Sequence, residues 1–297
     1  MKQSHLIAVN TLIIWGTTVL RVIPPLILVP FLIHHLGDSG YGQYALIWSL
    51  LLGIEHLESS LQSGGVKYGA AYLAQGRIGD LNKVLSSTSL YSLGLGALSS
   101  LAIVATAFLG FANSPAMMIS LIIVGIMMLI LVPTTPYVGI IQTKQRHYIS
   151  SIAAILAQYS GLLIVVVWFR FVGPSVEALI AILAGTLLVS RLAQVPVAHR
   201  LIPGLQNRPK FFDREIFRYV LAFGAMTVLS AACMIVHSTG MRWLAGLLVS
   251  TTFVAHLAIF LMPGSIVSQI VQAMTGTIMP AFTRHTSRPR TATASQS

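Results

Sequence analysis

The chain has 297 residues, of which 55% are hydrophobic and only 8% are charged, and its mean hydropathy is +0.82. Soluble domains carry about 25% charged residues, so this sequence has too few charges to cover a water-soluble surface of its size. The composition excludes a soluble enzyme and indicates a polytopic membrane protein. The formal net charge of +11 does not indicate nucleic-acid binding, because Lys and Arg stand singly or in small groups between long apolar runs.

Eight apolar segments approach the roughly 20 residues that a helix needs to cross a bilayer. They predict helices at 6–33, 43–66, 85–110, 116–141, 149–171, 176–197, 219–238 and 250–274. We therefore expect an all-α polytopic membrane protein with about eight transmembrane helices. Its expected parts are a first six-helix lobe (1–197), a cytoplasmic connector (198–218), the first two helices of an incomplete second lobe (219–282) and a disordered basic tail (283–297).

The distribution of basic residues predicts the orientation in the membrane. With a cytoplasmic N-terminus, the inside segments hold 15 of the 18 Lys and Arg residues, including Arg191 and Arg200 near the connector. Of the other three, Arg170 and Arg242 fall in short outside loops, and Arg21 lies within the first span. This positive-inside bias predicts a multi-pass protein of the inner (plasma) membrane with both termini in the cytoplasm.

Charged residues within the apolar spans are the candidate functional residues, because a charge in hydrocarbon is costly. Arg21 lies in the middle of the first span, and Glu55 and Glu58 lie in the second. The two glutamates are three residues apart, so they share one helix face. Arg21 and Glu55 are each about 13 residues from the expected outside loop 34–42, roughly 20 Å at the rise of a helix, so we expect them at one depth.

Two interpretations of these charges remain open. In the first, Arg21 snorkels or forms a buried ion pair that only determines helix packing. In the second, which we favour, Arg21 meets an anionic substrate in a hydrated cavity, and Glu55 or Glu58 exchanges a proton or cation. Pro24 and Pro25 follow Arg21 directly and predict a kink in the helix, which is typical of a cavity wall.

The sequence contains no constellation of a catalytic site. It has no metal-ligand cluster, no nucleophile elbow and no phosphate-binding glycine loop, and its single cysteine, Cys233, cannot form an intrachain disulfide. We therefore expect neither an enzyme nor a bound metal or cofactor.

Several motifs resemble polysaccharide exporters and O-antigen (Wzx-type) flippases. The stretch LGDSGYGQY at 36–44 resembles the turn that follows the first helix of these proteins. The stretches GVKY at 65–68 and YLAQG at 72–76 resemble the cytoplasmic segment after their second helix. The stretch RPKFFD at 208–213, which leads into YVLAFG at 219–224, resembles the beginning of their second lobe. The order and spacing of these motifs extend over most of residues 1–280.

The resemblance implies the fold of the multidrug/oligosaccharidyl-lipid/polysaccharide (MOP) exporter superfamily, with two helical lobes around a cavity that opens alternately to each side. It implies that the substrate is an undecaprenyl-pyrophosphate-linked oligosaccharide, flipped across the inner membrane during O-antigen or surface-polysaccharide synthesis. Arg21 matches the position of a basic cavity residue in relatives, and Glu55 or Glu58 would correspond to an acidic residue of the second helix.

The chain departs from the family in length, since its relatives use twelve to fourteen helices. The residues after Phe282 do not resemble the family's continuation, so we expect a truncation or a shifted reading frame. Two alternatives to the flippase remain. One is a multidrug or organic-cation antiporter of the same superfamily, and the other is a non-transporting membrane scaffold that pairs with polysaccharide polymerase machinery. Besides membrane lipids, the expected partner is the lipid-linked oligosaccharide.

Overall fold

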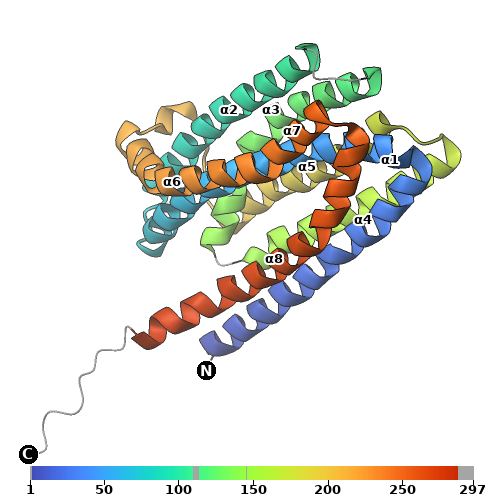
Figure 1. The fold of residues 1–297 in the computed structure, drawn as a ribbon. Coiled ribbons are helices and arrows are strands. Elements are labelled where there is room, and N and C mark those ends of the chain that lie inside the picture. Colours follow the sequence, from blue (N-terminus) through green and yellow to red (C-terminus); the bar gives the residue numbers. More distant parts are fainter. Residues whose placement is uncertain (1, 110–113, 145, 287–297) are drawn as a thin grey trace, which may run out of the picture.

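The computed structural model describes residues 2–109, 114–144 and 146–286, and this part of the chain is built from helices (Figure 1). The α-helices are α1 (Lys2–Ala74), α2 (Ile78–Phe108), α3 (Pro115–Thr143), α4 (His147–Phe171), α5 (Val176–Leu201), α6 (Arg214–Ile235), α7 (Met241–Leu248) and α8 (Thr251–Thr286). A 3-10 turn, η1 (Pro209–Phe211), precedes α6, and a π-helical turn, η2 (Val236–Gly240), joins α6 to α7.

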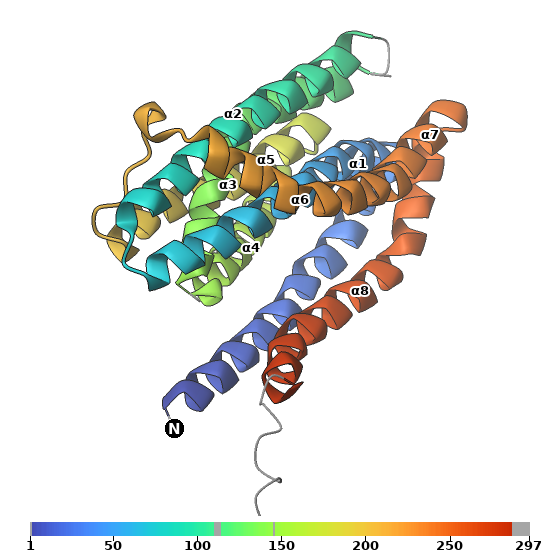
Figure 2. The same ribbon diagram turned by 90° about the vertical axis from the view of Figure 1, so that its left-hand side faces the viewer.

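Helix α1 consists of two legs that meet at Gly37. Gly37 has φ 69° and ψ 174°, a conformation that glycine adopts without steric penalty, and it is the non-helical residue inside α1. The first leg (2–36) and the second leg (38–74) therefore diverge from this point (Figures 1 and 2). The expected outside loop 34–42 is thus reduced to one glycine. Pro24 and Pro25 do not interrupt the helix, because the backbone keeps helical dihedral angles there.

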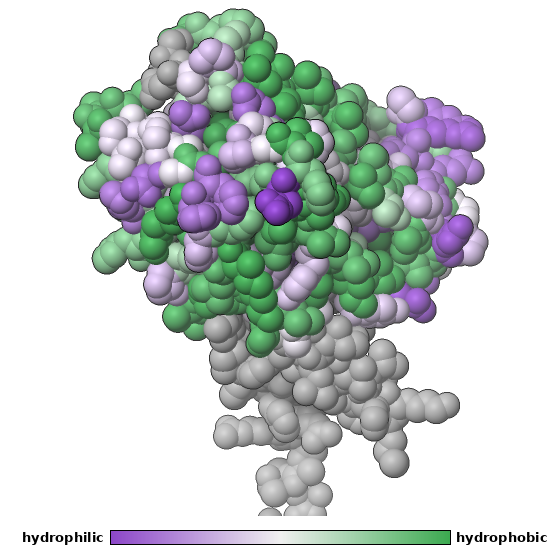
Figure 3. Space-filling view, turned by 90° about the vertical axis from the view of Figure 1, so that its right-hand side faces the viewer, coloured by the Kyte–Doolittle hydropathy of each residue, from purple (hydrophilic) through white to green (hydrophobic). Residues whose placement is uncertain are grey.

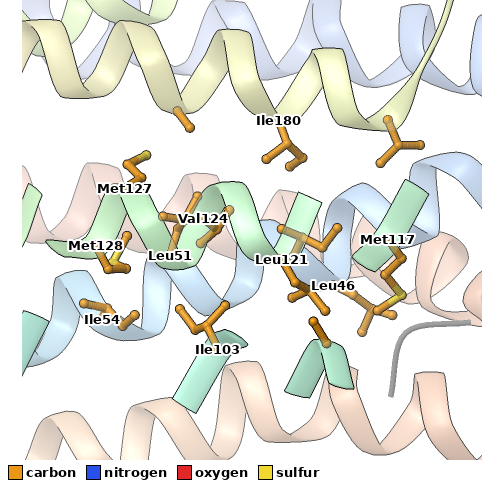
Figure 4. Close-up of a cluster of buried hydrophobic side chains, with 14 of the residues drawn as sticks. Leu46, Leu51, Ile54, Ile103, Met117, Leu121, Val124, Met127, Met128 and Ile180 are labelled. Atoms are coloured by element: carbon orange, nitrogen blue, oxygen red, sulfur yellow. The ribbon is translucent and has the colours of Figure 1, made fainter. Parts of the chain in front are cut away.

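The largest hydrophobic core joins the second leg of α1 to α2, α3 and α5 (Figure 4). Met117, Leu121 and Met128 of α3 are almost fully buried in it, and Leu46 of α1 and Ile180 of α5 pack beside them. The methionines of α3 therefore contribute to packing. A second core joins the first leg of α1 to α4 and α5, with Ala255 of α8 also buried there.

The outer surface of the helices is apolar over large areas (Figure 3). Exposed large side chains include Leu98, Leu101, Phe108, Leu156 and Phe171, which are more than 60% exposed. Such a surface matches lipid and not water. In the described chain, six helices are long and apolar enough to cross a membrane.

The expected number of spans was eight, and two differences explain the lower count. Helix α1 counts once although it contains the two expected spans 6–33 and 43–66, and α6 is not among the six helices. The other five expected spans correspond to α2, α3, α4, α5 and α8.

The connector between α5 and α6 is attached to one end of the bundle. Asn82 of α2 donates from Nδ2 to the carbonyl oxygen of Gly204 (3.2 Å) and accepts from the backbone N–H of Gln206 (2.9 Å). The backbone N–H groups of Arg208 and Asp213 donate to the hydroxyls of Ser86 and Ser87. The segment is therefore held by specific bonds along most of its length.

The end of the described chain differs from the expectation in two places. The expected outside loop 239–249 is helical, because η2 and α7 occupy it. Helix α8 continues to Thr286, four residues into the segment expected as a disordered tail, and residues 287–297 lie outside the described part. Helix α8 packs along α1, and Figure 1 shows the two running side by side.

Candidate functional site

A cavity of about 470 Å³ is lined by residues of both legs of α1 and of α3, α4 and α5. Its existence follows from the turn at Gly37, since the two legs diverge and α4 and α5 cover the space between them. Apolar and aromatic residues line part of it, among them Leu28, Tyr44, Trp48 and Leu162. The polar and charged lining residues are Arg21, Glu55, Glu58, Gln62, Gln142, Ser150, Gln158, Thr186, Ser190, Arg191 and Gln194.

The structure brings the three candidate residues from the sequence into this one cavity. Arg21 is on the first leg of α1, and Glu55 and Glu58 are on the second, so the depth expected from the sequence places them in a common site. Arg21 lies within the electrostatic influence of Glu55. In the described part of the chain, however, Arg21 forms no ion pair within 4.0 Å with either glutamate.

Arg21 also has an unused hydrogen-bond donor. Its Nε is buried and has no hydrogen-bond partner among the described residues. Pro24 and Pro25 line the same cavity one turn further along the leg, and Tyr159 of α4 donates to the carbonyl oxygen of Leu20 (3.0 Å). This bond ties α4 to the leg beside Arg21. A guanidinium held here can donate to an acceptor that enters the cavity.

Glu58 is the most buried charged residue of the site, with 2% of its surface exposed. Its Oε2 accepts a hydrogen bond from the hydroxyl of Thr135 on α3 at 2.6 Å. Its Oε1 is buried without a partner among the described residues. The side chain of Glu55, one turn earlier, remains 39% exposed. The two glutamates thus share a face, as expected, but occupy different environments.

Arg191 of α5 is the functional candidate that the sequence analysis missed. Its Nη2 lies 3.7 Å from Oε2 of Glu58 and 4.0 Å from Oε1 of Glu55, and its side chain is 17% exposed. The assignment of Arg191 to the basic residues near the cytoplasmic connector was therefore wrong, because it lies within α5 and lines the cavity.

A sequence signal for Arg191 was available. It is about ten residues from the end of α5 at Leu201, or roughly 15 Å along the axis, and apolar residues surround it. The same argument that selected Arg21 therefore applies to Arg191. Arg191 was instead counted with the basic residues that follow it in the sequence, so its position inside a span was overlooked.

The wall between α4 and α5 is built from hydrogen-bonded polar side chains. Ser150 of α4 donates to Oε1 of Gln194 on α5 at 2.8 Å, and Ser190 donates to the carbonyl oxygen of Ala153 at 2.9 Å. Gln194 in turn donates to the carbonyl oxygen of Ser190. These bonds hold α5 against α4 and so maintain the position of Arg191.

The cavity combines two arginines and two glutamates on an otherwise apolar and amide-rich wall. Within the described ranges, no group of three or more His, Cys, Asp or Glu side chains is arranged to hold a metal ion. The arrangement can bind a ligand through charge and hydrogen bonds, with formal charges that cancel when all four groups are ionised.

Two solved structures share this architecture. One, described as a multidrug resistance MATE family transporter of the MOP superfamily in an inward-facing conformation, aligns with a TM-score of 0.64 at 15% identity. The alignment covers 91% of this chain and 62% of that one. This chain therefore shares the fold of that transporter. The multi-pass membrane architecture expected from the sequence is confirmed.

The second structure, described only as protein A, aligns with a TM-score of 0.70 at 12% identity. The alignment covers 92% of this chain and 64% of the second structure. The chain thus spans less than two thirds of the length of either solved structure. No family model matches the sequence, and no curated protein matches it.

Proposed function

We propose that this chain translocates an undecaprenyl-pyrophosphate-linked oligosaccharide across the inner membrane by alternating access, in O-antigen or other surface-polysaccharide synthesis. The transporter fold and the cavity within the first lobe support this proposal. The sequence motifs at 36–44, 65–68 and 208–213 support the polysaccharide branch of the superfamily.

The proposal rests mainly on the incomplete hydrogen bonding of the Arg21 guanidinium. Its buried Nε has no partner among the described residues, although it lies in the wall of a cavity inside an apolar bundle. A buried donor of this kind costs free energy unless an acceptor reaches it. Phosphate oxygens form short, strong hydrogen bonds with a guanidinium, so a diphosphate in the cavity would bind the guanidinium group of Arg21, which lines it.

The organic-cation antiporter is the weaker candidate. Such a substrate needs carboxylates that are free to contact it, and the half-exposed Glu55 is a candidate for that contact. However, Arg191 contacts both glutamates, and Arg21 lines the same cavity. A cationic substrate would therefore meet two arginines.

Reconstitution in proteoliposomes tests the proposal. A fluorescent lipid-linked glycan placed in one leaflet should become accessible in the other only when the chain is present. Arg21→Ala should reduce this flipping at least about tenfold, because a charge-assisted hydrogen bond is lost. Arg21→Lys should restore it only in part, because lysine cannot form the bidentate contact.

Arg170→Ala is the matched control, since Arg170 is exposed near the end of α4 and does not line the cavity. Membrane abundance of each variant separates loss of transport from loss of folding. Normal flipping by well-expressed Arg21→Ala would contradict the role of Arg21. Exchange of an organic cation without glycan flipping would favour the antiporter, and neither activity would favour the scaffold.

A further inference from the structure

The ion pairs of Arg191 leave much of its hydrogen-bonding capacity unused toward the glutamates. The contacts to Glu55 and Glu58 both involve Nη2, at 4.0 Å and 3.7 Å, which is longer than a charge-assisted hydrogen bond of about 2.7–2.9 Å. A guanidinium carries five donors in a fork that matches two oxygens of a carboxylate or phosphate. Electrostatic attraction therefore holds Arg191 near the glutamates, but the two contacts do not form a bidentate pair of hydrogen bonds.

Arg191 and Arg21 line the same cavity, one from α5 and the other from the first leg of α1. They are close enough to influence each other electrostatically. Two like charges that face one cavity are compensated best by an anion between them. A diphosphate ester carries more than one negative charge and has oxygens on two phosphorus atoms, so it can engage both arginines.

We infer that Arg191 is a second anion-binding residue, which exchanges its glutamate partners for the diphosphate when the substrate enters. This inference rests on the proposed function and identifies how the same site would recognise the headgroup. In the free state, Glu55 and Glu58 neutralise Arg191. In the bound state, the diphosphate contacts both Arg21 and Arg191, and the glutamates lose their cationic partner.

The exchange changes the environment of Glu58 most strongly. Besides Arg191 of α5, the groups acting on it are the hydroxyl of Thr135 on α3 and the like charge of Glu55 on its own helix. A buried carboxylate that loses its cation next to an incoming anion takes up a proton from water, because an unpaired buried charge is costly. Binding of the diphosphate is therefore linked to proton uptake by Glu58.

Binding of undecaprenyl pyrophosphate to the purified full chain, measured between pH 6 and pH 8, tests this exchange. Arg191→Gln and Arg21→Gln should each weaken binding by about tenfold or more. Glu58→Gln should bind more tightly than the wild type, because it removes a competitor for Arg191. Glu58→Gln should also lose the part of the pH dependence that belongs to Glu58, while the titration of the ligand itself remains in both proteins.

Arg191→Gln by itself leaves Glu58 buried without its cation and can therefore misfold. The double variant Arg191→Gln/Glu58→Gln removes both charges and keeps a polar side chain at each position, so it is compared with Glu58→Gln for binding and for thermal stability. Loss of the tight binding in the double variant at equal stability would support the inference. Arg170→Gln is the control for loss of a positive charge outside the cavity.

The outcomes separate the inference from the proposed function. Binding that depends on Arg21 but is the same in Glu58→Gln and the double variant would overturn the role of Arg191 alone. Binding by Glu58→Gln that is no tighter than the wild type and equally pH-dependent would overturn the exchange. Failure of the wild-type chain to bind the lipid diphosphate would overturn both this inference and the proposed function.

Discussion

The backbone of Thr251, at the start of α8, lies directly against Gly42 on the second leg of α1, and a Cβ atom at Gly42 would collide with the Thr251 carbonyl group. The hydroxyls of Ser39 and Thr251 are hydrogen-bonded at 3.0 Å beside this contact. The close approach therefore joins α1 to α8 at the end of the molecule where α1 turns (Figure 2).

Gly42→Ala should separate α8 from α1 at this end, because backbone atoms cannot move aside as a flexible side chain can. The measurement is the yield of a disulfide between Ser39→Cys and Thr251→Cys in a Cys233→Ala background. We expect Gly42→Ala to reduce the yield and Gly42→Leu to abolish it. Gly94→Ala on α2 is the control, since a Cβ there meets no atom within 4 Å. Unchanged yields in both Gly42 variants would contradict the contact.

Thr135→Val should destabilise the cavity wall. The substitution removes the 2.6 Å hydrogen bond to Glu58 and leaves a buried acceptor unsatisfied, which costs about 1–3 kcal/mol. The measurement is thermal unfolding of the purified chain in detergent. Thr135→Ser keeps the hydroxyl and should remain close to the wild type. Equal stability of the Val and Ser variants would show that the bond contributes little.

Asp213 should make the beginning of α6 sensitive to acid. Its Oδ1 accepts from the backbone N–H groups of Ile216 and Glu215, and these bonds, with Lys83 nearby, hold the pKa of Asp213 below its usual value. A lowered pKa contributes stability that is complete above the ordinary carboxyl pKa and is lost as the pH falls through the lowered value. Hydrogen exchange of the first turn of α6 should therefore accelerate in acid beyond the intrinsic rate.

Variants of the cap separate its charge from its hydrogen bonds. Asp213→Ala should reduce the hydrogen-exchange protection of the first turn of α6 at neutral pH. The expected loss of helix stability is about 0.5–2 kcal/mol, the usual cost of a missing N-cap. Asp213→Asn should keep most of the protection, because asparagine also caps helices, but should lose the acid transition. Asp80→Ala is the control, since Asp80 also pairs with Lys83 but does not cap α6. An acid transition that persists in Asp213→Asn would assign it to another group.

The connector should be cytoplasmic if the positive-inside pattern determines the orientation. The exposed Gln206 is replaced by cysteine in a Cys233→Ala background, and intact cells are treated with a membrane-impermeant maleimide. We expect labelling only after the membrane is opened. His34→Cys, exposed near the turn at Gly37, should be labelled from outside and serves as the opposite control. Labelling of Gln206→Cys in intact cells would reverse the topology.

The candidate site was partly predictable because depth in a membrane can be calculated from residue spacing. Arg21 and Glu55 were expected at one depth, and both line the cavity. Arg191 was not predicted as a site residue. Because many basic residues follow it in the sequence, it was counted with those of the cytoplasmic segments. Whether such a residue lies in a loop or within a span depends on where the helix ends, and α5 continues to Leu201.

Boundaries between helices were harder to predict than the helices themselves. The residues expected as outside loops at 34–42 and 239–249 are helical except at Gly37 and Val249, because a helix continues wherever its backbone can keep hydrogen-bonding internally. Polar residues there indicate the edge of the membrane and not the end of a helix.

The sequence alone determined that this protein crosses a membrane repeatedly, and it selected Arg21, Glu55 and Glu58, because both conclusions follow from the cost of placing charge in hydrocarbon. The tertiary structure decided which charges pair. Arg191 contacts the glutamates and Arg21 does not, since pairing depends on how α5 packs against α1, a contact between residues more than 130 positions apart.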